Sequence, residues 1–302
     1  MPEIASTYSI VAMDIEAGEI GAAVQSHFFS VASAVLWVEP GAGAVATQSV
    51  VNRQFGPDGL GMLASGKQAP EVLEALLKSD PGEAFRQAAV LDVLGNSAVH
   101  TGSSCVREAG HRSGQYFSVQ ANMMLTPTVW EAMEAAFLST PGSLSDRMLA
   151  ALKAAEHEGG DIRGKQSAGM KIVKTRASGD VSVDTVLDLR VEDHQNPLAE
   201  LERLLDLNTG YSLLEAGDTA MEKREITAAM DYYRRARELL GENPEALYWH
   251  GVALLEAGDI RQGLDILKPL FDKQPNWLEL TRRLPESRLA SFDIIRLMKE
   301  QE

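Results

Sequence analysis

The first fifty residues consist of short runs of small apolar residues separated by turns. The runs at 8–13, 20–25, 31–38 and 44–48 are rich in Ala, Val and Ser, and a Pro-Gly pair at 40–41 precedes the last one. Runs of this length bounded by turn residues indicate β-strands. Small residues of this kind suit sheets that are covered on both faces. This region is therefore predicted to supply strands to layered sheets.

Three later segments have the apolar spacing of amphipathic helices. Residues 69–78 place apolar side chains three and four positions apart behind a proline, and 127–138 and 143–157 show the same spacing. Ser143 followed three residues later by Asp146 is a capping pattern for the start of the last segment. These segments are predicted helices.

Further strands are predicted after the first helix. Residues 85–93 and 97–100 flank a Leu-Gly-Asn turn and predict a hairpin, and 116–124, 167–175 and 183–191 are also predicted strands. Strands and helices do not alternate strictly, which disfavours a Rossmann fold or a barrel. The order favours an α+β fold in which two antiparallel sheets stack face to face with helices outside.

The character of the chain changes after Pro197, where a wholly helical region begins. The sequence of residues 210–218 recurs at 251–259, and a repeat of this period indicates stacked helical hairpins. The second copy resembles a tetratricopeptide repeat (TPR), with Gly251 and Gly263 at its small-residue positions. We therefore expect two domains, residues 1–197 and residues 198–302.

Composition narrows the class of protein. The chain has 302 residues, is 45% hydrophobic and carries a net charge of −15, which argues against binding to nucleic acid or to an anionic membrane. A single cysteine, Cys105, excludes an internal disulfide and makes a cysteine-ligated metal site improbable. No leader-like or membrane-spanning apolar run is evident. We expect a cytoplasmic protein without a metal or cofactor.

A glycine-rich polar segment at 159–169 leads directly into a predicted strand. Its glycines allow close backbone approach, and Asp161, Arg163, Gln166 and Ser167 offer donors and acceptors there. An isolated loop of this kind is commonly a solvated turn. The segment is therefore either such a turn or part of a binding site.

Several other polar residues are candidates for chemistry. His100 with Thr101 ends a predicted strand, where the imidazole can act as a base or be held structurally. His111 lies in a predicted flexible polar loop, where it can contact a ligand or another subunit. Gln120 and Asn122 are two apart on a predicted strand and share a face, so burial of these amides requires hydrogen-bond partners.

Taken in order, eight short stretches resemble the family catalogued as domain of unknown function 1028, whose members resemble N-terminal-nucleophile (Ntn) hydrolases. The resemblance covers most of the first region and implies a four-layer αββα sandwich. The resemblance implies no particular reaction, because the family has none established. The stretches lie at 7–12, 43–48, 55–56, 99–102, 110–111, 119–122, 160–167 and 188–194.

The resemblance places Thr7 at the position of the nucleophile. In Ntn hydrolases the first residue of the mature chain attacks an amide carbonyl, and its own α-amine takes the proton. Residues 46–48 fall where the strand that stabilises the oxyanion lies in that fold. Two features depart from the pattern: residues 1–6 precede Thr7, and the Asp and Lys that support the threonine in proteasome-type members have no counterpart. Thr7 is then either a nucleophile or a β-branched residue that opens a strand.

Three hypotheses follow. The first is an amidohydrolase that acts on a small amide or carboxylate-bearing substrate. The second keeps the fold as a non-catalytic protein whose glycine-rich loop binds an anion or a peptide. The third makes the TPR-like helical region an adaptor for a protein partner. The resemblance also implies a homodimer formed through outer helices. The hydrolase hypothesis assigns catalysis to Thr7, Gln48, His100, Asn122 and Asp161, a carboxylate anchor to Arg163, and further substrate contacts to Gln166, Ser167, Thr101 and His111.

Overall fold

The computed structural model describes residues 4–5, 7–284 and 294–300. The chain forms two compact units, Met1–Arg203 and Leu204–Glu302. The predicted α+β class is confirmed, because an antiparallel sheet domain is followed by a helical region. Each unit is described separately.

The first of two sheets in the first unit is five-stranded. Its order is β1–β5–β6–β7, with β4 also paired to β5, and each pair is antiparallel. The predicted hairpin is present, since β6 and β7 are consecutive and paired. The strands are β1 Ile4–Ala5, β4 Leu36–Glu39, β5 Gly43–Val50, β6 Arg86–Asp92 and β7 Ser97–Thr101.

The second sheet is six-stranded and also antiparallel throughout. Its order is β11–β10–β3–β2–β9–β8, which places β2 and β3 at its centre. The strands are β2 Thr7–Asp14, β3 Glu19–Ser26, β8 Gly110–Gly114, β9 Phe117–Asn122, β10 Ser167–Lys174 and β11 Thr185–Val191.

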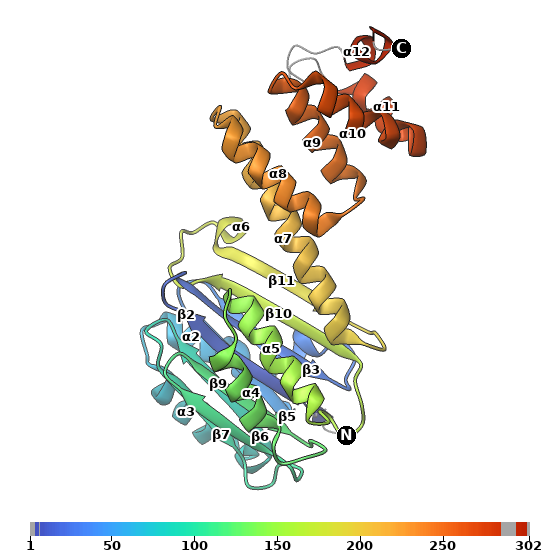
Figure 1. Cartoon of the computed structure of the whole chain (residues 1–302). Coiled ribbons are helices and arrows are strands. Elements are labelled where there is room, and N and C mark those ends of the chain that lie inside the picture. The colour runs from blue at the N-terminus through green and yellow to red at the C-terminus, as the bar shows by residue number, and fades with distance from the viewer. Residues whose placement is uncertain (1–3, 6, 285–293, 301–302) are drawn as a thin grey trace. The chain divides into compact units, whose positions relative to one another are not determined.

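Helices cover the outer face of each sheet (Figure 1). α2 (Phe55–Ala64) and α3 (Ala69–Lys78) pack on β5 and β6, while α4 (Val129–Ser139) and α5 (Leu144–His157) pack on the six-stranded sheet. The predicted capping box at the start of α5 is present: the backbone N–H of Asp146 donates to the hydroxyl of Ser143. Two short helices, η1 (Glu83–Phe85) and α6 (Val181–Asp184), directly precede β6 and β11.

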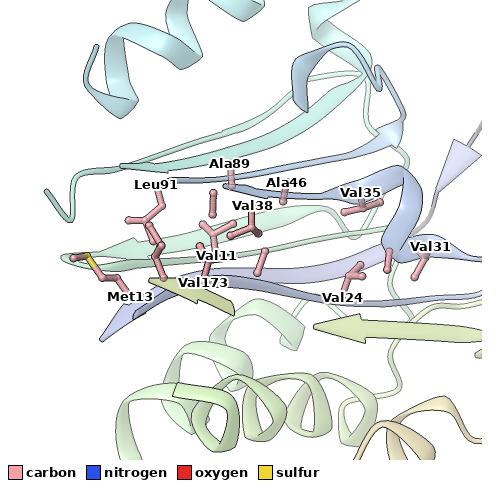
Figure 2. Close-up of a cluster of buried hydrophobic side chains, with 14 of the residues drawn as sticks. Val11, Met13, Val24, Val31, Val35, Val38, Ala46, Ala89, Leu91 and Val173 are labelled. Atoms are coloured by element: carbon pink, nitrogen blue, oxygen red, sulfur yellow. The ribbon is translucent and has the colours of Figure 1, made fainter. Parts of the chain in front are cut away.

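An apolar core fills much of the space between the two sheets (Figure 2). Val11 and Val24 from the six-stranded sheet meet Ala46, Ala89 and Leu91 from the five-stranded one, and all are fully buried. Small side chains at many of these positions let the sheets lie close together, as their composition predicted.

Two local predictions were wrong. Residues 31–38 were expected to form one strand, but Val31–Val35 form helix α1 and only Leu36–Glu39 continue as β4. The core buries four of the five residues of α1: Val31, Ala32, Ala34 and Val35. The pattern of apolar positions in so short a run does not distinguish a helix from a strand. Residues 110–114, expected as a loop, form edge strand β8 through pairing with β9.

The second unit is built from helices joined by short connections. Tyr233 and Leu240 of α8 pack with Leu214 of α7, and Leu255 of α9 packs with Leu267 of α10. The helices of this region are α7 Pro197–Glu222, which begins in the first unit, α8 Ile226–Leu240, α9 Pro244–Glu256, α10 Ile260–Lys273, α11 Pro275–Arg283 and α12 Ile294–Glu300.

Replacement of Gly251 by leucine is expected to disrupt the crossing of α9 and α10. A Cβ at Gly251 would lie 2.6 Å from Cγ of Leu267, so a larger side chain forces the helices apart. Overpacking of this kind lowers the free energy of unfolding by about 1–3 kcal/mol. Scanning calorimetry should show a lower transition for the helical unit. The matched control is Ala257→Leu, at an exposed position at the end of α9, and an equal shift in both variants would contradict the argument.

Candidate functional site

The layer between the sheets changes from apolar to polar at one end. Along β2, Val11 and Met13 belong to the apolar core, and Thr7 and Ser9 follow on the same face because strand side chains alternate. Gln48 continues the inward face of β5 beyond Ala46 in the same way. Thr7, Ser9 and Gln48 are fully buried, so their polar groups require partners within the protein.

Gln87 of β6 is the centre of this polar layer. Its Nε2 donates to Thr101 Oγ1 (2.8 Å) and to the carbonyl oxygens of Gly110 (3.2 Å) and Ala121 (2.9 Å). Its Oε1 accepts from Nε2 of Gln48 (2.7 Å) and Nδ2 of Asn122 (3.0 Å). Because Nε2 faces two carbonyl oxygens, the amide can adopt only this orientation.

Two amides hold the backbone carbonyl of Thr7. Nε2 of Gln48 donates to this oxygen at 3.2 Å and Nδ2 of Asn122 at 3.4 Å. Ser9 donates from Oγ to Oε1 of Gln48 at 2.6 Å and accepts at the same distance from Nε2 of Gln120. The predicted residues Thr7, Gln48 and Asn122 therefore lie together in one network.

Thr7 also stands in a row of polar residues across the six-stranded sheet. Ser167 of β10 pairs with Ser26 of β3, Ser26 with Thr7, and Thr7 with Asn122 of β9. Residues directly opposite in antiparallel strands share a face, so all four face the other sheet. The Thr7 hydroxyl donates to Oγ of Ser26 at 3.4 Å.

Ile4 and Ala5 lie in a different sheet from Thr7. Ile4 and Ala5 form β1, which pairs with Val50 and Ser49 of β5, whereas Thr7 begins β2 in the opposite sheet. The side chain of Thr7 is fully buried.

Asp161 and Arg163 form a pair with each other in the glycine-rich loop. Oδ1 of Asp161 accepts from the backbone N–H and from Nε of Arg163, at 2.9 and 3.2 Å, and Oδ2 accepts from Nη2 at 3.0 Å. The backbone N–H of His27 donates to Oδ2 at 2.9 Å. Through these bonds Asp161 fixes the conformation of the loop beside the end of β3. The guanidinium of Arg163 is bound to the carboxylate of Asp161.

Gly160 allows this loop to approach the outer face of the sheet. Its φ is +53°, and a Cβ there would lie 2.9 Å from Oε2 of Glu156. That oxygen accepts a hydrogen bond of 2.7 Å from the hydroxyl of Tyr8. Burial and the nearby Glu156 raise the pKa of Tyr8 well above its usual value, so the phenol stays protonated as the donor.

Gln166 and Ser167 connect the loop to β10. Nε2 of Gln166 donates to Oδ1 of Asp193 at 3.0 Å, and the Ser167 hydroxyl accepts from the backbone N–H of Val31 at 3.0 Å. Gln166 lines an open pocket of about 710 Å³, whereas Ser167 is fully buried. The pocket is lined by His27, Lys165, Gln166, Asp193, His194, Gln195 and Asn196.

Thr101 and His111 pair across the two sheets, with 2.8 Å between Oγ1 and Nδ1. Because Gln87 already donates to Thr101, the hydroxyl proton is available to Nδ1. Burial, together with His100 and Arg112 nearby, lowers the pKa of His111, which favours the neutral imidazole as acceptor. Both residues line a second open pocket, of about 620 Å³.

The side chains of His100 and Thr101 lie on opposite faces of β7. Ala98 packs with the helices outside the five-stranded sheet and Val99 packs with the core between the sheets. Alternation therefore places His100 on the outer face, where its Nε2 lies 3.1 Å from the carbonyl oxygen of Glu83. His100 does not join the polar network that contains Thr7.

Backbone strain accompanies the network. Ser49, Met123 and Glu108 have φ values of +70°, +59° and +55°, which side-chain-bearing residues seldom adopt. Ser49 follows Gln48 and Met123 follows Asn122 in the chain. Strain of this kind is often held at functional sites by the surrounding structure.

No group of three or more His, Cys, Asp or Glu suited to a metal ion occurs among the described residues. In the same part of the chain no helix has the length and apolar content needed to span a bilayer.

Sequence reasoning missed Gln87, the residue with the most partners in the network. The available signal was its place at an inward-facing position of a predicted strand otherwise rich in Ala, Val and Leu. A glutamine at such a position must find partners when it is buried.

Comparisons with known proteins give one family. A model for a family of unknown function, DUF1028, matches residues 7–201. A crystal structure of a DUF1028 protein from Silicibacter pomeroyi matches with a TM-score of 0.61 and 31% identity, covering 67% of this chain and 89% of that one. No curated protein matches the chain.

Replacement of Gln87 by leucine should strongly destabilise the first unit. The change removes the five hydrogen bonds of Gln87 and leaves buried polar groups in both sheets without this partner. Each buried polar group left without a partner costs about 1–3 kcal/mol, so we expect a total loss of at least about 3 kcal/mol in urea unfolding. The control is Gln115→Leu, at an exposed position between β8 and β9. Equal stability of the two variants would show that the network does not hold the sheets together.

Proposed function

The chain belongs to the family of unknown function DUF1028, and from its site we propose that the first unit hydrolyses an amide bond in a small, carboxylate-bearing molecule. The observation that carries this proposal is the position of Thr7. A hydroxyl lies at the end of a central strand, in the polar part of the layer between two sheets, with its own carbonyl held by Gln48 and Asn122.

The fold we propose for this unit is the αββα sandwich of Ntn hydrolases. Two antiparallel sheets facing each other with helices on both outer faces support it. In that fold a threonine acts only when its α-amine is free. The proposal therefore includes removal of the segment before Thr7.

The reaction would proceed through an ester. Oγ1 of Thr7 attacks the amide carbon, the α-amine of Thr7 accepts the hydroxyl proton, and that proton passes to the departing amine. Water then attacks the ester, gives one proton to the amine and releases the acid, and Oγ1 recovers its proton. The side-chain amides of Gln48 and Asn122 donate to the carbonyl oxygen of Thr7 at this end of β2, and the Thr7 hydroxyl donates to Ser26.

For the helical unit we propose a TPR-like role in binding a protein partner. The two sequence repeats also repeat a contact: a Cβ at Gly210 would meet Cγ of Leu240 at 2.5 Å, and one at Gly251 would meet Cγ of Leu267 at 2.6 Å. In each case a glycine of one helix lies against a leucine of the following one. Stacked hairpins of this type present extended surfaces for binding.

A second candidate function is ligand binding without catalysis. The pairing of Ile4 and Ala5 with β5 favours it, because a segment held in a sheet keeps the nitrogen of Thr7 acylated. The open pocket beside Thr101 and His111 would then be the binding site.

Substitution of Thr7 distinguishes the two functions. With small acyl anilides as substrates, Thr7→Ala should lower kcat/KM by at least about a thousandfold, on the scale of nucleophile loss in hydrolases, while Thr7→Ser retains measurable activity. Intact-mass measurement of the wild type should give a chain that begins at Thr7.

The control variant is Thr140→Ala, at the end of α4, which should keep full activity. A chain that retains the residues before Thr7, together with equal kinetics for Thr7→Ala and Thr140→Ala, would reject the hydrolase and leave the binding function.

A further inference from the structure

No further strand of the described residues pairs with the outer edge of β11 in the six-stranded sheet. The order of the sheet ends at β11, which is paired with β10 on its other side. An edge strand carries a row of backbone N–H and C=O groups that can accept another strand. At seven residues, Thr185–Val191 is long enough to form several such bonds.

The two faces of β11 differ in chemistry. Leu187 and Val191 are buried, and the partly buried Leu189 lies opposite the buried Met170 of β10, so positions 187, 189 and 191 form an apolar face. Asp188 and Arg190 occupy the other face and are exposed, with Nε of Arg190 3.0 Å from Oδ1 of Asp188. A strand added to this edge must match both faces.

A second copy of β11 meets this requirement only in certain registers. In a two-fold antiparallel pair, opposite residue numbers have a constant sum, and opposite residues share a face. If odd-numbered residues of one copy lie opposite odd-numbered residues of the other, the sum of the two residue numbers is even. One residue of the strand is therefore opposite its own counterpart.

Charge selects among the central registers. Centring on residue 188 places Asp188 opposite Asp188, and centring on residue 190 places Arg190 opposite Arg190. Centring on Leu189 places Asp188 opposite Arg190 twice and Leu187 opposite Val191 twice. Opposite charges stabilise a cross-strand pair and like charges destabilise it.

We propose that β11 pairs with β11 of a second copy of this chain, with Leu189 on the two-fold axis. The six-stranded sheet then continues from one copy into the next. Exposed apolar side chains occur immediately before the strand, where Val181 and Val183 of α6 are 71% and 64% exposed. Apolar surface of this kind beside an open edge is typical of a protein contact.

The opposite edge of the same sheet lacks this complementarity. Strand β8 has five residues, Gly110–Gly114, and Arg112 at its centre would meet Arg112 of a second copy. Its guanidinium is also bound to Glu131 of α4. This edge therefore serves as an internal control for the proposal.

Charge reversal tests the proposed register in the full chain. Sedimentation at a series of concentrations should show a dimer, and Asp188→Arg or Arg190→Asp should each raise its Kd by about tenfold or more, because two like-charge pairs form. The double variant Asp188→Arg with Arg190→Asp restores opposite charges and should restore the dimer. Arg112→Asp, on the other edge, should leave Kd unchanged.

A cysteine at the axis tests the register independently. In a Cys105→Ser background, Leu189→Cys should form a disulfide-linked dimer on oxidation, because opposite residues lie about 4.5–5.5 Å apart between Cα atoms. Leu187→Cys should not, because its counterpart is four residues along the strand, about 14 Å away. A wild-type monomer at every concentration, a dimer that the double variant fails to restore, or equal crosslinking at 187 and 189 would overturn the proposal.

Discussion

The hydrogen bonds of Gln87 are the interaction on which the rest of the first unit depends. This one side chain binds Thr101 and Gln48 in its own sheet and Asn122, Gly110 and Ala121 in the other. Such bonds are strong in a buried layer but costly when incomplete. Gln87 thus joins the sheets at their polar end, and the amides that hold Thr7 and the hydroxyl that meets His111 take their positions from it.

Local patterns were sufficient to predict most strands and helices but not the exceptions. Every residue of α1 except the exposed Ser33 is buried, so its apolar positions are compatible with helix or strand. Strand β8 has two glycines and three polar residues, and only pairing with β9 makes it a strand. In both places tertiary contacts override the local signal.

The sequence predicted the grouping of site residues where the family resemblance and the alternation of side chains along strands agreed. Thr7, Gln48 and Asn122 lie together, and Thr101 with His111 reaches them through Gln87. His100 lies on the outer face because one step along a strand reverses the side chain. The pairing of Arg163 with Asp161 depends on loop geometry, which residue types alone do not specify.

The way in which Thr7 is held bears on both proposed functions. Its carbonyl is bound by side chains of β5 and β9, its hydroxyl donates to Ser26, and its strand neighbours are β3 and β9. The preceding segment pairs elsewhere, with Val50 and the strained Ser49 of β5. Removal of that segment would therefore free the nitrogen of Thr7 without breaking the bonds that position the residue. Because β3, β5 and β9 hold Thr7, its position can survive cleavage of the chain before it. A residue held by the preceding segment would lose its position on cleavage.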